Sequence, residues 1–402
     1  MLYNDVCNDN LSRLGFGTMR LPLKEDGKTI DEIEFQKMVD YAINNGINYF
    51  DTAYPYHDGH SELALGRALK KYPRDSFKIA SKFPGHNIIK VPNPKEVFEE
   101  QLRKCQVEYF DYYLLHNVCE IDISIYEDPK YGIIDYFLEQ KRLGRIKHLG
   151  FSSHARVENL EAFINRHEGV FEFCQIQLNY LDWTLQNGKE KYDVLTKHNI
   201  PVWVMEPVRG GKLVNDINEE EINKLKEFRN DESVASFGFR FLMKYPNIKM
   251  ILSGMSNMEQ MIDNIKTFNE DKPLSDDETN YLFEIAERLK DAVPCTKCHY
   301  CTKGCPMGLD IPLLIASYND LKFAQAFTVP MQMDALSEDK KPSACISCGQ
   351  CAMMCPQKID VPKVLADFNE LLSRSVKWAD VCRQRNEAEE RLKKEKAKDT
   401  NA

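Results

Sequence analysis

Two cysteine-rich stretches organise this 402-residue chain, Cys295-Thr-Lys-Cys298-His-Tyr-Cys301-Thr-Lys-Gly-Cys305-Pro306 and Cys345-Ile-Ser-Cys348-Gly-Gln-Cys351-Ala-Met-Met-Cys355-Pro356. Both follow the spacing C-x2-C-x2-C-x3-C-P, so three thiols lie close together in each stretch and a fourth follows just beyond. The proline after each fourth cysteine prevents a helix from continuing and lets the chain turn away. The repeat indicates two sites of the same kind in the C-terminal part of the chain.

This spacing is the one with which bacterial two-cluster ferredoxins hold cubane iron–sulfur clusters, the fourth cysteine of each run binding the other cluster. The pattern therefore predicts two [4Fe-4S] clusters with crossed ligand sets: Cys295, Cys298, Cys301 and Cys355 for one, and Cys345, Cys348, Cys351 and Cys305 for the other. A pair of zinc sites and a disulfide framework are the alternatives. Zinc sites usually divide their ligands into two distant pairs, and disulfides are not expected in a chain without a secretory signal.

Composition and charge argue against several classes of protein. Hydrophobic residues make up 43% of the chain and charged residues 29%, which is ordinary for a globular protein. No run of about 18 apolar residues occurs, so we expect no membrane-spanning helix. The net charge of −9 argues against nucleic acid as the main partner. The N-terminus does not resemble a signal peptide, and the cysteines outside the two motifs are scattered, so we expect a cytoplasmic protein.

Upstream of the cysteines, short apolar runs alternate with amphipathic helical patterns. The expected strands are residues 14–18, 48–52, 77–82, 110–116, 146–152, 173–178, 201–205 and 249–253. The expected helices are residues 31–44, 61–71, 93–106, 133–143, 157–165, 189–197, 234–244 and 258–266. Eight strand-then-helix units predict an α/β fold, a parallel (β/α)8 TIM barrel. The alternative is a doubly wound sheet, but no G-x-G-x-x-G follows any strand.

We expect three parts along the chain. Residues 1–290 would form the barrel and end in a helix that begins at Ser275, where Ser275-Asp-Asp-Glu278 has the spacing of a capping box. Residues 291–382 would form a mainly helical, ferredoxin-like iron–sulfur domain. Residues 383–402 would form a charged tail with little to bury, either a fraying helix or a disordered segment.

Ionisable residues stand at the ends of three consecutive expected strands, where the chemistry of such barrels gathers. Asp51 ends the second strand with Tyr56 just beyond it, Lys82 ends the third and His116 ends the fourth. A nearby ammonium lowers the pKa of a tyrosine, a carboxylate can hold that ammonium, and a histidine can orient a carbonyl. Together the four could protonate an alkoxide while a hydride arrives at carbon. Taken singly, each residue is better explained without a catalytic role, Asp51 as a helix cap, Tyr56 as a loop aromatic and His116 as a satisfied strand-end residue. Their common position at the strand ends of one face weakens these explanations.

The stretches that contain these residues resemble the signatures of the aldo-keto reductases. They are Asn48-Tyr-Phe-Asp51-Thr-Ala-Tyr-Pro-Tyr56 with Ser61-Glu62, Ile79-Ala-Ser-Lys82, Leu114-Leu-His116, Leu149-Gly-Phe-Ser152, Gln175-Ile-Gln-Leu-Asn179-Tyr180 and Ser253-Gly-Met-Ser256. The resemblance covers most of the chain before the cysteines and implies a (β/α)8 barrel that binds a nicotinamide cofactor without a Rossmann domain. It implies that Tyr56 is the general acid/base, tuned by Lys82 and Asp51, and that His116 orients the substrate.

The same resemblance implies a set of cofactor contacts. Those expected at the nicotinamide are Ser152, Ser153 and Gln175 on the carboxamide, with Met205 over the ring. Those expected along the pyrophosphate are Glu206, Pro207, Arg209 and Gly211, and those at the adenosine end are Ser253, Gly254, Ser256, Gln260 and Asn264. The family implies NADP, but Gly254 and Gln260 stand where NADP-specific members usually carry basic residues that recognise the 2′-phosphate. NADP and NAD both remain open.

Three hypotheses follow for the joined halves, because the barrel moves two electrons as hydride and a cubane cluster moves one at a time. The protein could be an oxidoreductase whose clusters connect the barrel to ferredoxin, a flavoprotein or another carrier. It could be a simple carbonyl reductase with structural clusters, or a non-catalytic electron-transfer or redox-sensing protein. A flavin would divide the electron pair, but no flavin motif supports one. The intact set of strand-end residues and the presence of two clusters favour the first hypothesis, with a small-molecule carbonyl or alcohol as substrate.

Overall fold

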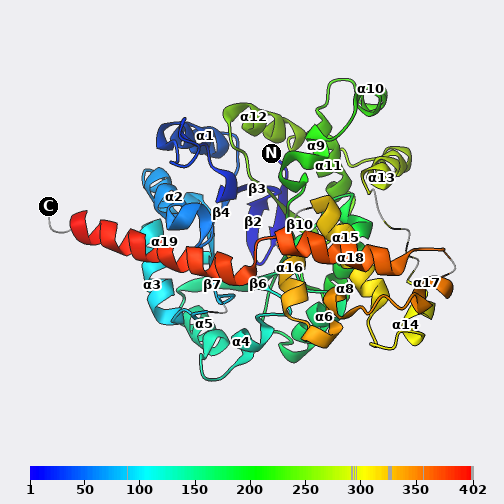
Figure 1. The fold of residues 1–402 in the computed structure, drawn as a ribbon. Coiled ribbons are helices and arrows are strands. Elements are labelled where there is room, and N and C mark those ends of the chain that lie inside the picture. Colours follow the sequence, from blue (N-terminus) through cyan, green and yellow to red (C-terminus); the bar gives the residue numbers. More distant parts are fainter. Residues whose placement is uncertain are drawn as a thin grey trace.

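Eight parallel strands close into a barrel, as the alternation of apolar runs and helical patterns predicts (Figure 1). The computed structural model describes residues 1–402 except 88, 291–292, 294, 296, 325–327, 356 and 400–402. The strands are β3 (Leu14–Gly17), β4 (Tyr49–Asp51), β5 (Lys78–Phe83), β6 (Phe110–Val118), β7 (Ile146–Ser153), β8 (Cys174–Gln177), β9 (Val202–Met205) and β10 (Ile248–Ser253). Each pairs with the next, and β10 pairs back with β3, so the predicted (β/α)8 fold is confirmed.

Helices cover the outside of the barrel. The longer ones are α1 (Glu32–Asn44), α2 (Ser61–Leu69), α3 (Pro94–Cys105), α5 (Ile133–Arg142), α6 (Val157–Arg166), α8 (Gly188–Lys197), α10 (Glu219–Phe228), α11 (Val234–Met243), α12 (Met258–Thr267) and α13 (Asp276–Leu289). Short helices α4 (Ile123–Glu127), α7 (Asp182–Leu185) and α9 (Lys212–Asn215) lie in the loops that follow β6, β8 and β9. The capping box predicted at Ser275 and Glu278 starts α13, so both residues satisfy backbone N–H groups that the helix leaves free.

An antiparallel hairpin, which the sequence did not predict, closes the N-terminal end of the barrel. Strands β1 (Tyr3–Val6) and β2 (Asp9–Ser12) are joined by Cys7 and Asn8, which have φ angles of 52° and 63°. Two residues with positive φ are the mark of a tight hairpin turn, but this turn lacks the glycine that usually signals it. The hairpin's Val6 and Leu11 are buried among inward-facing residues of the barrel strands.

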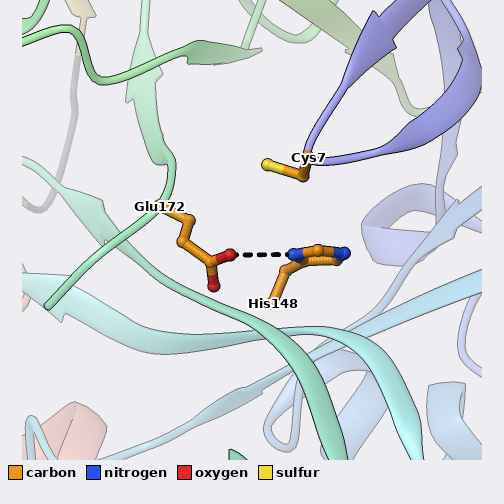
Figure 2. A group of neighbouring side chains, drawn as sticks. All are labelled: Cys7, His148 and Glu172. Atoms are coloured by element: carbon orange, nitrogen blue, oxygen red, sulfur yellow. Dashed lines mark hydrogen bonds and ion pairs between the residues drawn. The ribbon is translucent and has the colours of Figure 1, made fainter.

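Polar side chains fix this hairpin to the strands beneath it. The turn places Cys7 beside His148 and Glu172, with one possible ligand atom of each lying within 4.8 Å of the others (Figure 2). His148 Nδ1 lies 3.0 Å from a Glu172 oxygen, and Lys141 Nζ donates to the other oxygen at 2.7 Å. Asp9 of the hairpin receives bonds from Lys78 and Tyr112 at 2.7 and 2.9 Å. Both oxygens of the Glu172 carboxylate already accept bonds. Glu172 therefore serves as a structural anchor at the N-terminal end of the barrel, opposite the end where the strands finish.

A mainly helical domain follows the barrel, as predicted. It contains α14 (Tyr300–Lys303), α15 (Ile311–Ala324), α16 (Thr328–Asp334), α17 (Gln350–Met353) and α18 (Val361–Arg374). It has an apolar core of its own, in which Leu314 of α15 and Leu365 and Phe368 of α18 are almost fully buried. No helix within the described ranges is both long enough and apolar enough to cross a membrane.

The last helix, α19 (Trp378–Asp399), returns to the barrel and lies across the loops near α2 and α3 (Figure 1). The boundary expected at residue 383 falls inside this helix. The expectation of a tail with little to bury is wrong up to Leu392, because Ala388 and Leu392 within it are 95% buried, and Trp378 and Cys382 just before it are at least 99% buried. These residues share one face of the helix, so the charged composition of the segment conceals an apolar face that packs on the barrel.

Candidate active site and cysteine sites

The four ionisable residues predicted at strand ends lie together at the C-terminal end of the barrel. Asp51 ends β4 and Lys82 stands one residue before the end of β5, the next strand in the barrel. Lys82 Nζ donates to Asp51 Oδ1 at 2.6 Å and to the Thr52 carbonyl at 2.8 Å. Both charged side chains are almost completely buried, with exposures of 0% and 4%. The pair is therefore held rigidly inside the barrel, where its charges are poorly screened.

Tyr56 begins the short 3-10 helix η2 (Tyr56–Gly59) that follows β4. The Lys82 ammonium lies 5.1 Å from the centroid of the Tyr56 ring, and the His116 ring lies 5.9 Å from it. Burial raises the pKa of Tyr56 above its ordinary value, and the positive charge of Lys82 offsets only part of this effect. The phenol is therefore protonated at neutral pH. The lowering of the tyrosine pKa that the sequence predicts from Lys82 is present but is outweighed by burial.

His116, two residues before the end of strand β6, is a neutral imidazole. Burial lowers its pKa well below the ordinary value, and the neighbouring His86, Lys82 and Arg385 lower it further. Its Nδ1 atom is buried and has no hydrogen-bond partner among the described residues. A buried ring nitrogen without a partner is costly, so this atom is available to a polar group of a ligand.

Behind Lys82, a buried polar network fixes the end of β5. Glu62 accepts hydrogen bonds from Ser81 at 2.6 Å and from Gln101 at 2.7 Å. Gln101 also donates to the Lys82 carbonyl at 3.0 Å and accepts from Tyr113. Glu62 belongs to a stretch that the sequence singled out, but Gln101 and Tyr113 are not near it in the chain. The network holds the backbone of Lys82 and so the position of its ammonium.

The residues expected at the nicotinamide carboxamide come from β7 and β8. Ser152 stands opposite Gln175 in the strand register, and Gln175 Nε2 lies 3.6 Å from the sulfur of Met205 on β9. The Gln175 Oε1 atom is buried without a partner among the described residues, which fits an amide N–H of a bound carboxamide. Ser152 Oγ accepts from the Asn117 backbone at 2.8 Å. Ser153, the last residue of β7, instead donates to the carbonyl of Val118, the last residue of β6, at 2.9 Å.

The residues expected along the pyrophosphate lie in the tight loop after β9. Glu206, Arg209 and Gly211 have φ angles of 57°, 52° and 93°, and Pro207 stands between the first two. Arg209 is 93% buried and lies 3.1 Å from Asp182, so its charge is directed into the protein. Arg209 therefore points away from the surface formed by the other residues expected along the pyrophosphate.

A different cation, Arg20, lies beside the loop after β9. We did not predict it from the sequence. It ends the 3-10 helix η1 (Thr18–Arg20) that follows β3, pairs with Glu206 at 2.7 Å and is 40% exposed. Its guanidinium lies next to Gly210, where an added Cβ would be 3.0 Å from Nη2. Arg20 follows a strand end, so the same rule that found Tyr56 applies to it.

The residues expected at the adenosine end form one surface where β10 ends and α12 begins. Ser256 donates to the Arg20 carbonyl at 2.9 Å, and its backbone N–H donates to Gln260 at 2.8 Å. Asn264 donates to the Ser253 hydroxyl at 2.8 Å. Gly254 lies against the side chain of Arg20, where an added Cβ would be 3.5 Å from the Arg20 Cβ. The predicted cofactor residues thus run from β7 to β10 around one side of the barrel mouth.

The eight motif cysteines gather around two cavities. One is lined by Cys295, Cys298, Cys301 and Cys355, and the other by Cys305, Cys345, Cys348 and Cys351. Each cavity thus takes three cysteines from one motif and one from the other, which is the crossed grouping that the spacing predicts. All eight are free thiols in the structure, so no disulfide framework is present among them.

The surroundings of both cavities fit an anionic cluster. Apolar side chains complete the walls, among them Ile315 and Ile359 in one cavity and Leu309 and Leu365 in the other. The backbone turns into the left-handed region at matching positions of the two motifs, at Lys297 and His299 and at Ser347 and Gly349. Such turns direct backbone N–H groups inward, and the Ser347 N–H already lies 3.4 Å from the Cys345 sulfur. Binding of the clusters by these thiols stays a prediction.

Comparisons with known proteins agree with both halves of the molecule. Residues 13–287 match the model of the aldo/keto reductase family, and residues 294–359 match the model of a 4Fe-4S dicluster domain. The chain is 31% identical over 189 residues to probable aldo-keto reductase 1 of Glycine max, covering 43% of this chain and 49% of that protein. It is 23% identical over 326 residues to the NADH-specific methylglyoxal reductase of Escherichia coli, covering 70% of this chain and 96% of that protein. The chain thus spans about half the length of the Glycine max relative.

Solved structures share the barrel. An aldo-keto reductase from Bacillus halodurans in its holo form superposes with a TM-score of 0.58 at 24% identity, covering 71% of this chain and 96% of that one. An aldo-keto reductase from Klebsiella pneumoniae in complex with NADPH superposes with a TM-score of 0.58 at 20% identity, with the same coverage of both chains. At these identities the likeness establishes the fold, and the covered part corresponds to the barrel.

Proposed function

The chain belongs to the aldo/keto reductase family and carries a 4Fe-4S dicluster domain, and on this basis we propose that it reduces the carbonyl group of a small molecule with a nicotinamide cofactor or oxidises the corresponding alcohol. The observation that carries this proposal is the buried Lys82–Asp51 pair beside the Tyr56 phenol and the neutral His116. These groups have the protonation states that carbonyl reduction needs.

In the proposed reaction, a nicotinamide supplies a hydride to the carbonyl carbon when it is bound. Tyr56 donates its phenolic proton to the carbonyl oxygen as negative charge develops there. Lys82 stabilises the resulting phenolate, and Asp51 keeps the ammonium in place. His116 hydrogen-bonds the same oxygen from its neutral ring and so orients the substrate. Solvent returns the proton to Tyr56 after the alcohol leaves.

For the cofactor, we propose that the free Gln175 Oε1 and the neighbouring Ser152 hold the carboxamide and that Met205 covers the ring. The position of Arg20 beside Gly210 and Gly254 supports a role for it in binding the cofactor phosphates, with Glu206 as its partner when no cofactor is present. Arg20 thus places a positive charge close to the positions where the sequence lacks the basic residues usual in NADP-specific members. The proposal therefore keeps both NADP and NAD.

For the cysteine domain, we propose two [4Fe-4S] clusters with the crossed ligand sets, which supply one-electron transfer when bound. The paired cavities and the inward-turned N–H groups support this assignment. In this proposal the clusters connect the barrel to ferredoxin or to a flavoprotein in the cytoplasm.

One observation favours a second candidate, in which the cluster domain braces the active site. Helix α19 follows the cluster domain directly and lies over the barrel mouth, where the Trp378 indole donates to the His86 carbonyl at 3.2 Å. Loss of the clusters would then disturb the mouth without any electron transfer being involved.

An anaerobic titration separates these functions. Cluster-replete protein is mixed with NADPH or NADH, and the visible absorbance of the clusters is followed together with nicotinamide oxidation. Bleaching of the clusters as the nicotinamide is consumed supports the electron-transfer function. Reduction of an added aldehyde without bleaching supports the bracing function, and turnover of neither cofactor with any aldehyde contradicts the proposed reductase.

A further inference from the structure

Helix α19 is docked over the barrel mouth by specific contacts. Asn386 accepts a hydrogen bond from Asn87, in the loop after β5, at 2.7 Å. Leu392 packs on Gly59, where an added Cβ would lie 3.1 Å from the leucine side chain. Trp378 is 99% buried against the barrel. The side chain of Arg385 lies between these contacts, so the helix carries it to the mouth in a defined position.

The guanidinium of Arg385 reaches the residues that surround the reacting atoms. Its Nη1 lies 2.6 Å from His86 Nε2, and its Cζ lies 4.9 Å from the centroid of the Trp378 ring. His86 Nδ1 donates to the His116 carbonyl at 3.0 Å, so His86 Nε2 accepts from Arg385. The His86 ring is 4.8 Å from the His116 ring, which in turn borders Tyr56. Two imidazole rings, those of His86 and His116, therefore lie between Arg385 and the proton donor Tyr56.

Arg385 has no anionic partner among the residues that the structure describes. Its neighbours on α19 are paired elsewhere, Arg383 with Asp380 and Lys393 with Glu389. Burial lowers the pKa of Arg385, and the neighbouring Cys382 and Tyr56 offset only part of this effect. A guanidinium has five N–H donors, and the bond to His86 uses one. A charge that is largely removed from water and lacks a counter-ion is costly unless a ligand supplies one.

A cavity lies beside this guanidinium, between α19 and the loops after β4 and β5. Pro55, Pro84 and Ala388 form apolar walls. The polar lining includes the bases His86, Lys104 and Arg385 and the acids Asp58 and Glu389, of which Glu389 is paired with Lys393. The planar fork of a guanidinium matches the two oxygens of a carboxylate. The cavity therefore has the features of a site for the acidic end of an organic molecule.

We propose that Arg385 binds the carboxylate of the substrate, so that the protein acts on aldehydes or ketones that also carry a carboxylate group. This inference rests on the proposed function, because it places the carbonyl group between Tyr56 and His116 and the carboxylate toward α19. The selectivity would then be set by a helix that lies beyond the cluster domain in the chain. Loss of that domain would change substrate choice.

The test compares the three isomeric carboxybenzaldehydes with their methyl esters, using the cluster-replete full chain. Wild-type protein is expected to prefer at least one acid over its ester in kcat/KM. The Arg385→Gln variant should lower this preference about 30-fold, the size expected for one charged hydrogen-bonding group. Arg385→Lys keeps the charge but loses the fork, and should restore part of the preference. Arg383→Gln, an exposed position on the same helix, should retain the wild-type preference.

Binding of benzoate, followed by calorimetry, supplies a readout that does not depend on turnover. It should be weakened by Arg385→Gln and not by Arg383→Gln. Equal loss of activity toward acid and ester in Arg385→Gln, or benzoate binding that is indifferent to Arg385, would overturn the inference. If no aldehyde is reduced by wild-type protein but benzoate binding still depends on Arg385, the proposed reductase function fails and the carboxylate site stands.

Discussion

The barrel mouth and the cysteine domain place their reactive groups in opposite ways. In the barrel, Asp51, Lys82 and His116 come from three strands, and direct bonds hold the first two inside the protein. In the cysteine domain, three of the four thiols around each cavity are close neighbours in the chain, and Cys298 and Cys348 are exposed. The barrel organises its site with its own hydrogen bonds, whereas the cysteine sites have walls but, if they bind the proposed clusters, would depend on bound iron to hold the thiols together. Mutations should therefore act locally in the first region and through metal content in the second.

The largest effect is expected from Tyr56→Phe, which removes the proton donor and leaves the packing of the ring intact. Carbonyl reduction should fall about 100-fold to 10,000-fold, the usual contribution of a general acid. Binding of the nicotinamide, followed by fluorescence titration, should be nearly unchanged. Tyr72→Phe, which removes a bond to Asp40 far from the mouth, is the matched control. Substantial turnover by Tyr56→Phe would contradict the assigned role.

The next effect concerns the crossed cysteines. Cys355→Ser should damage the cluster bound by Cys295, Cys298 and Cys301, although Cys355 belongs to the other motif. Cys305→Ser should damage the second cluster. Each variant should lose about half of the bound iron, and electron paramagnetic resonance should show that the two variants keep different clusters. If each variant instead loses the cluster bound by the other cysteines of its own motif, the crossed ligand sets are wrong.

A smaller effect is expected from pH. Because the pKa of Tyr56 is raised by burial and that of His116 is lowered, neither group changes protonation between pH 6 and 8. The kcat/KM for carbonyl reduction should therefore be nearly flat over this range. Alcohol oxidation needs the phenolate, so its kcat/KM should rise with pH, up to tenfold for each unit. A step in the reduction profile close to the ordinary histidine pKa would show that His116 titrates during catalysis.

The smallest effect is expected at the N-terminal end of the barrel. Burial opposes ionisation of Glu172, but bonds from His148, Lys141 and the Leu149 N–H hold the pKa of its carboxyl at about 2. A depressed folded-state pKa contributes stability above the unfolded value of about 4.3, and this contribution disappears as pH falls toward 2. Glu172→Gln should lower the free energy of unfolding by about 1–2 kcal/mol at pH 7 and by less at pH 3.

Urea denaturation followed by tryptophan fluorescence measures this difference. Glu168→Gln, an exposed position in the same loop, is the control. Catalysis should be unaffected by Glu172→Gln in folded protein, because the hairpin lies at the end of the barrel away from Tyr56. A destabilisation that persists at pH 3 would show that packing, and not the charge of Glu172, anchors the hairpin.

Several features could be predicted because they depend on neighbours in the chain. The strands were recognised because parallel barrel strands are buried on both faces and read as apolar runs. The spacing of the cysteines along the chain is enough to predict which of them lie together, including the fourth cysteine of each group, which comes from the other motif. Tyr56, Lys82 and His116 were found because parallel strands end at one face of the barrel.

Other features arose only from the tertiary structure. The β1–β2 hairpin turns at Cys7 and Asn8, which carry no strong turn signal. Helix α19 hides a narrow apolar face within a charged segment, and its Arg385 meets His86 across 299 residues of chain. Such long-range docking depends on the summed fit of two surfaces, and the spacing of the apolar residues in one helix does not show which distant segment that helix packs against. Local chemistry is therefore readable from the chain, whereas the group that we propose selects the substrate became visible only when distant segments were brought together.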